Sequence, residues 1–135
     1  MSSPAISTRF LSLALKATTF VNLAGGLTAL LLPDLFARLL YGRPLPAEPY
    51  IWRYHICLWG FVVAMGLAYA LAARDPEHEH SILLSGGLGK TLVACVFTEM
   101  LLTGLGTWML ASAIAWDGTL GILFLVALWQ RRKQL

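Results

Sequence analysis

Five charged residues stand inside long apolar stretches of the sequence, where charged side chains are rare. They are Lys16, Arg53, Lys90, Glu99 and Asp117. A charge near the centre of a bilayer costs about 2.5–3.5 kcal/mol on insertion scales, so such residues are usually paired or serve the movement of ions and protons. An ammonium group and a carboxylate held together in a low dielectric can also exchange a proton. These residues are therefore the candidates for chemistry in this chain.

The depth of each charge follows from a helical rise of about 1.5 Å per residue. Arg53 falls about 5 Å and Glu99 about 7 Å below the same interface, with His55 at a similar level. We therefore expect an ion pair between Arg53 and Glu99. Lys90 and Asp117 both fall near the midplane, and we expect a second ion pair between them.

Asn22 lies near the same midplane on the first apolar stretch, where it can complete a polar cluster with Lys90 and Asp117. One geometric condition applies to Lys90 and Glu99, which are nine residues apart and point about 180° apart on a helix. Both reach their partners only if their helix lies between its two neighbours in the chain. The candidate ligand or proton-site residues are Asn22, Lys90, Asp117, Arg53, His55 and Glu99. The alternative is that the charge pairs only fix helix register.

The composition explains where these residues lie. Hydrophobic residues make up 58% of the 135 residues and charged residues 13%, with a mean hydropathy of +0.70. Soluble domains carry about 25% charged residues. Four apolar stretches, 10–32, 50–73, 81–103 and 106–130, each match the roughly 20 residues that a membrane-spanning helix needs. The sequence predicts a single all-α domain, an integral membrane four-helix bundle with up-down-up-down topology.

The first stretch is longer than the apolar region of a signal peptide and contains Lys16 and Asn22, so we expect a retained helix. Lys16 lies about 10 Å from the nearer face and is expected to reach the phosphate headgroups as an anchor. Between the first two spans, residues 34–41 are expected to form an interfacial helical turn that Asp34 caps and Gly42 ends.

Positive charge predicts the orientation. One side of the bundle collects Arg9, Lys16, Arg74, Arg131, Arg132 and Lys133, and the other collects Arg38, Arg43 and Arg53. The positive-inside rule then places both termini in the cytoplasm. The protein's surroundings are the lipid bilayer, with a homo-oligomer or a larger membrane complex as further partners. We expect no nucleic-acid partner, because the net charge of +3 is scattered along the chain.

Small residues recur every four positions in two of the spans. The rows are Ala14, Thr18, Asn22 and Gly26 on the first span, and Gly60, Ala64, Ala68 and Ala72 on the second. Such rows allow helices to approach closely in a membrane, and we expect both to pack inside the bundle.

Three kinds of site have little support in the sequence. Residues 84–91 resemble a P-loop, but leucine replaces the first glycine and no strand precedes them, so the glycines are expected to serve packing beside Lys90. His78 and His80 alone make no closed metal site, and His55, as the one intramembrane histidine, gives weak support for haem. Cys57 and Cys95 are expected to be buried thiols. We expect no metal and no cofactor.

The order of features resembles a known group. Pro33 after the first span, Ile51-Trp52, the Ala-Ala-Arg-Asp-Pro stretch ending at Pro76, the Gly-Leu-Gly-Lys stretch ending at Lys90, and Asp117 form a series over nearly the whole chain. It resembles a family of small, uncharacterised bacterial four-span membrane proteins, DoxX-like in size and topology. The resemblance implies the four-span fold and a place in the inner membrane of a bacterium, and it brings no activity with it.

The expected function is that of a small multi-pass membrane protein, either a carrier or a subunit of a membrane assembly. The alternative is a membrane-embedded enzyme that acts on a lipid-soluble substrate, with Asp117, Lys90 or Glu99 as acid–base groups.

Overall fold

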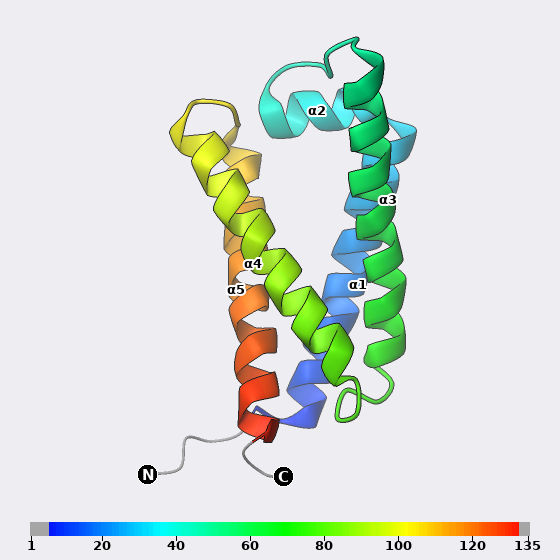
Figure 1. The fold of residues 1–135 in the computed structure, drawn as a ribbon, viewed down its shortest axis with the longest axis vertical. Helices are drawn as coiled ribbons and strands as arrows, with labels where there is room; N and C mark the ends of the chain where they lie inside the picture. Colours follow the sequence, from blue (N-terminus) through cyan, green and yellow to red (C-terminus); the bar gives the residue numbers. More distant parts are fainter. Residues whose placement is uncertain (1–5, 133–135) are drawn as a thin grey trace.

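The computed structural model describes residues 6–132 and contains five α-helices (Figure 1). They are α1 (Thr8–Leu31), α2 (Pro33–Tyr41), α3 (Pro49–Ala72), α4 (His80–Leu102) and α5 (Trp108–Arg132). Lys133 lies outside the described residues. The four long helices are apolar and long enough to cross a membrane. This confirms the predicted all-α fold with four spans, and each predicted boundary lies within two residues of the observed one.

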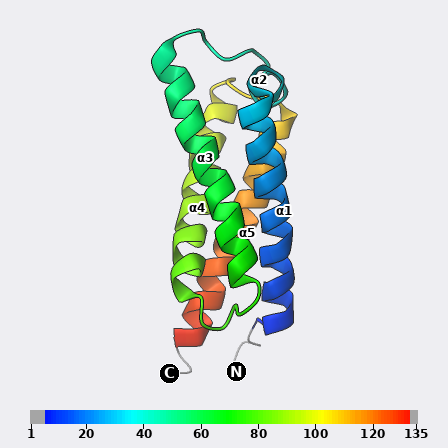
Figure 2. The same cartoon turned by 90° about the vertical axis from the view of Figure 1, so that its right-hand side faces the viewer.

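The four long helices form two pairs. α1 packs along α3, and α4 packs along α5, whereas α3 and α4 have few contacts with each other (Figures 1 and 2). The pairs converge at the end of the bundle where α1 begins and α5 ends, here called the terminus end. They diverge toward the opposite end, where α2 lies, here called the α2 end.

Glycines allow the close approach within each pair. A Cβ added to Gly26 on α1 would lie 2.6 Å from a methyl carbon of Val63 on α3. A Cβ on Gly121 of α5 would lie 3.0 Å from the backbone nitrogen of Thr91 on α4. Because these distances leave no room for even a methyl group, each glycine fixes a helix crossing.

One of the two predicted small-residue rows packs as expected. Thr18, Asn22 and Gly26 on α1 are buried. The row on α3 packs only at one end: Ala72 is buried, whereas Ala64 is exposed and nothing lies within 4 Å of a Cβ added to Gly60. Gly60 and Ala64 point away from the core, so the prediction that the whole row packs inside the bundle is wrong.

The short helix α2 lies across the α2 end of the bundle and is hydrogen-bonded to Thr107, the residue before α5. Thr107 donates its backbone N–H to the carbonyl of Leu40 at 3.0 Å and its hydroxyl to the carbonyl of Leu39 at 2.5 Å. Gly42 ends the helix in the left-handed conformation, at φ 72°, as predicted. Asp34 does not cap it: the helix begins one residue earlier, after Leu32, and Asp34 lies in the first turn, where a negative charge interacts favourably with the helix dipole.

At the terminus end, the loop between α3 and α4 is hydrogen-bonded to α1 and to α5. Ser12 of α1 donates to the carbonyl of Ala73 at 2.7 Å, and Thr8 hydrogen-bonds to Glu77. Arg131 of α5 donates to the carbonyl of Pro76. The loop therefore joins the two helix pairs at this end.

Apolar side chains form two separate cores. The core at the terminus end contains Leu11, Leu15, Tyr69, Ala72, Ala73, Leu83, Leu120, Phe124 and Ala127. The core at the α2 end contains Ala29, Leu40, Trp59, Phe97 and Leu110. The polar residues described next lie between these two cores along the helices.

Candidate functional site

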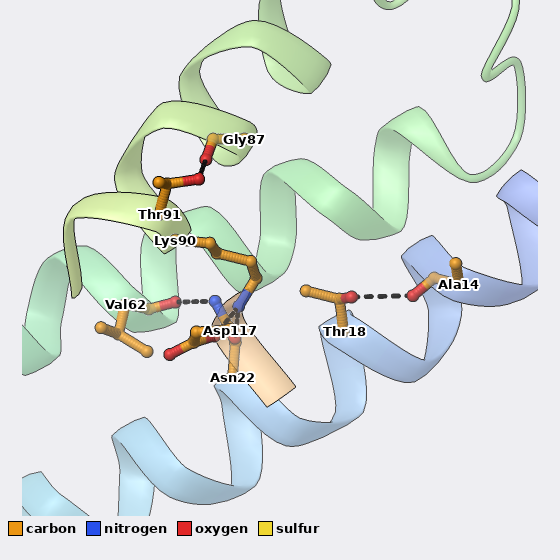
Figure 3. A network of polar contacts seen from close by, with 8 residues as sticks. All are labelled: Ala14, Thr18, Asn22, Val62, Gly87, Lys90, Thr91 and Asp117. Carbon is orange, nitrogen blue, oxygen red and sulfur yellow. Dashed lines mark hydrogen bonds and ion pairs between the residues drawn. The ribbon is translucent and has the colours of Figure 1, made fainter. Parts of the chain in front are cut away.

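Lys90 joins three of the four spans. Its ammonium nitrogen hydrogen-bonds to Oδ1 of Asp117 on α5 and donates to Oδ1 of Asn22 on α1 at 3.4 Å (Figure 3). The side chain of Lys90 is 7% exposed and that of Asp117 is 18% exposed. The structure thus brings together Asn22, Lys90 and Asp117, which we call the midspan cluster.

The remaining span, α3, completes the cluster through a backbone carbonyl and an aromatic ring. The amide nitrogen of Asn22 donates to the carbonyl of Val62 on α3 at 3.3 Å. The ammonium nitrogen of Lys90 lies 5.9 Å from the centre of the Tyr69 ring, within the range of a cation–π contact. All four spans therefore contribute to one polar network.

The position of the cluster follows from helix geometry. Lys90 lies ten residues after the first residue of α4, about 15 Å along its axis. Asp117 lies nine residues after the first residue of α5, which runs in the opposite direction. Both residues therefore reach the middle of the α4–α5 pair, as the sequence predicts.

Glycine packing beside Lys90 positions the ring of Tyr69. A Cβ added to Gly86 would lie 2.5 Å from the Tyr69 hydroxyl oxygen, and one added to Gly87 would lie 3.3 Å from the carbonyl oxygen of Gly121. These two glycines serve packing, as expected. Gly89 differs, since nothing lies within 4 Å of its added Cβ.

The predicted Arg53–Glu99 ion pair is wrong. Both residues are exposed, and neither forms an ion pair with another residue in the range 6–132. The prediction required α4 to lie between α3 and α5, but α4 packs along α5 and has few contacts with α3. Because Lys90 faces the interior, Glu99 points to the opposite side of α4.

His55 has a structural partner. Its Nε2 atom donates to the carbonyl of Ala29 at 2.8 Å, and the ring is buried between Trp52 and Trp59. That carbonyl would normally accept from the residue four positions later, which is Pro33 and has no N–H. His55 thus replaces a hydrogen bond that α1 loses at its end. The spacing between Ala29 and Pro33 is the sequence signal for a missing donor.

Other polar groups stand apart from the midspan cluster. Lys16 is exposed on the surface of α1, and both cysteines are exposed, which corrects the expectation of buried thiols. In the loop after α3, the pKa of His78 is raised because its ring hydrogen-bonds to the carboxylate of Asp75. Within residues 6–132, no group of three or more His, Cys, Asp or Glu side chains is placed to hold a metal ion.

Comparison of the chain with protein-family models, with curated proteins and with solved structures found no match.

Proposed function

We propose that this small multi-pass membrane protein is a carrier and that the midspan cluster binds its proton or small polar ligand. The observation that supports this is the meeting of Asn22, Lys90 and Asp117 between the two helix pairs. Many carriers bind their cargo near the midplane, between two helix units that move against each other. Here α1 with α3 and α4 with α5 are such units.

The chemistry of the cluster suits reversible binding. Lys90 and Asp117 neutralise each other, so the empty site holds no net charge in the apolar interior. A proton on Asp117, or an anion on Lys90, separates the pair. Asn22 and the face of the Tyr69 ring then remain as partners for the ammonium group. Binding therefore changes the contacts between the helix pairs.

The site belongs, in this proposal, to a protein of the bacterial inner membrane with both termini in the cytoplasm. Arg74 and Arg131 at the terminus end support this orientation, since positive residues collect on the cytoplasmic side. The resemblance to small DoxX-like four-span proteins agrees with it in size and topology.

A role as a subunit of a membrane assembly is the second candidate. It is favoured by the exposure of Arg53 and Glu99, two charges on spans that have no ion-pair partner in residues 6–132. A neighbouring chain is the simplest source of such partners.

Proton flux in proteoliposomes tests the carrier proposal. Vesicles that contain a pH-sensitive dye are given small organic cations, organic anions and neutral solutes in turn. We expect one class to drive proton movement, and we expect Asp117→Asn to abolish it. Asp34→Asn on the exposed surface of α2 is the matched control and should transport normally.

Two results would overturn the proposal. One is the absence of flux for every solute class in vesicles that hold folded protein. The other is normal flux from the double variant Lys90→Leu/Asp117→Met, because a site that works without its charges is only structural.

A further inference from the structure

Two opposite charges near the α2 end of the spans have no ion-pair partner among residues 6–132. Arg53 follows the first residue of α3 by four positions, and Glu99 precedes the last residue of α4 by three. At about 1.5 Å per residue, Arg53 lies about 6 Å and Glu99 about 4.5 Å from the end of its helix. Both residues therefore lie in the helical turns nearest the α2 end, and both side chains are exposed.

The two helices that carry these charges share one face of the bundle. α3 and α4 lie nearer the viewer than α1 and α5 in Figure 1, and they lie on the same side of the molecule in Figure 2. Arg53 and Glu99 are each about 200° around the helix from a buried residue, His55 and Phe97 respectively, so both point away from the core.

We propose that a second copy of this chain covers the α3–α4 face and forms a two-fold symmetric dimer. A symmetry axis that runs parallel to the helices, just outside this face, brings α3 of one protomer against α4 of its partner. The interface is isologous, so each contact occurs twice. Arg53 then pairs with the partner's Glu99, and Glu99 with the partner's Arg53.

The register set by these ion pairs continues along both helices. α3 and the facing α4 run in opposite directions, so equal steps from Arg53 and from Glu99 reach the same level. Cys57 lies four residues after Arg53 on α3, and Cys95 lies four residues before Glu99 on α4. Both are exposed free thiols, and a step of four residues turns the helix only about 40°. Cys57 therefore faces the partner's Cys95.

The next two levels pair small residues with large ones. Gly60 and Ala64 lie seven and eleven residues after Arg53 on α3. Leu92 and Leu88 lie seven and eleven residues before Glu99 on α4. These steps return to within about 20° of the starting direction. The two leucines are 65% and 56% exposed, and Gly60 has open space beside it. Each leucine thus meets a flat surface on the partner, and small residues let helices approach closely in a membrane.

This arrangement explains two features of the single chain. It gives Arg53 and Glu99 each a partner of opposite sign. It also gives a packing role to Gly60 and Ala64, which are turned away from the core of their own bundle. The dimer does not depend on what the midspan cluster binds.

The native cysteines provide the test. The full chain is reconstituted in lipid vesicles at a low protein-to-lipid ratio and treated with copper phenanthroline, and a non-reducing gel separates monomer from dimer. Two helices in close contact bring facing Cα atoms within the 4.4–6.8 Å that a disulfide spans. We expect a reducible dimer from the wild-type chain and none from Cys57→Ser or Cys95→Ser. Mixing the two single variants, each with a different tag, should restore a mixed dimer.

Charge variants test the ion pairs separately. Arg53→Glu brings two carboxylates together, and we expect at least about tenfold less cross-linked dimer, the change that corresponds to about 1.4 kcal/mol. Glu99→Arg should behave alike. The double variant Arg53→Glu/Glu99→Arg restores opposite charges and should recover cross-linking, which also shows that these chains fold.

Each contrary result overturns the proposal. Absence of a wild-type dimer means that lipid or another protein covers this face. A dimer that persists in Cys95→Ser means that Cys57 meets its own copy and the register is different. A double charge variant that cross-links no better than the single variants means that the ion pairs do not form.

Discussion

Removing either member of the Lys90–Asp117 pair should destabilise the protein far more than removing both. The side chains are 7% and 18% exposed, so a single change leaves the other charge in a mostly buried place. Breaking a buried ion pair costs about 3–5 kcal/mol, whereas replacing both partners with apolar residues is often neutral or stabilising. We expect Lys90→Met and Asp117→Leu each to lower the free energy of unfolding by about 3 kcal/mol.

The lower end of the range applies because the side chain of Asp117 is 18% exposed and so is not fully desolvated. Asn22 also loses its hydrogen bond from Lys90, which contributes about 1 kcal/mol. The double variant Lys90→Met/Asp117→Leu should therefore lie within about 1 kcal/mol of the wild type. The two single losses are then strongly non-additive, as expected for residues in direct contact.

Reversible unfolding in mixed detergent micelles, followed by circular dichroism, measures all four proteins of the cycle. The exposed lysine variant Lys16→Met is the matched control and should change stability little. Additive losses in the double variant would refute the reasoning, because they would mean that Lys90 and Asp117 stabilise the bundle through separate contacts.

Three further results are expected. His55→Ala should lower the free energy of unfolding by about 1–3 kcal/mol, because it leaves an α1 carbonyl buried without a donor; chemical unfolding measures this, and a loss near zero contradicts the assigned role. Gly121→Ala should separate α4 from α5 and lower the thermal midpoint by several degrees, whereas Gly89→Ala, which meets open space, should leave it equal or higher. The contact between His78 and Asp75 raises the pKa of His78, so its contribution to stability is present at low pH and is lost as pH rises through that raised pKa. NMR titration should show the pKa of His78 falling toward its ordinary value in Asp75→Asn.

Depth along the spans was predictable from the sequence, and this is why the midspan cluster was found. Hydrophobic length sets where each helix starts, and the rise per residue then places Asn22, Lys90 and Asp117 at one level. Chain order gave a further constraint for Lys90 and Asp117, because consecutive spans joined by a tight turn pack side by side.

Which helices contact each other could not be predicted in the same way. Arg53 and Glu99 have matching depth, but depth does not say whether α3 touches α4. The prediction for the row that begins at Gly60 is limited in the same way, because the spacing of its small residues identifies a flat helix face but does not show what packs against that face. Lipid and a helix partner are both apolar, so the hydrophobic pattern of a membrane helix does not distinguish them.

The hydrogen bond between His55 and Ala29 lay within reach of sequence reasoning. Pro33 removes a donor four residues after Ala29, and the orphan carbonyl requires a partner. Which side chain supplies it depends on the crossing of α1 and α3, which glycine contacts determine.

The midspan cluster also has a consequence for biosynthesis. Lys90 is translated 27 residues before Asp117, so α4 emerges from the ribosome before its charge partner exists. Asn22 is already in the bilayer, but it is a neutral partner for a lysine. Insertion of α4 alone therefore carries the cost of an unpaired lysine, about 2.5–3.5 kcal/mol, and α4 and α5 are expected to leave the translocon together as a helical hairpin. A chain truncated before Asp117 should leave α4 poorly inserted, and the spacing of the two charges thereby sets the order in which this protein enters the membrane.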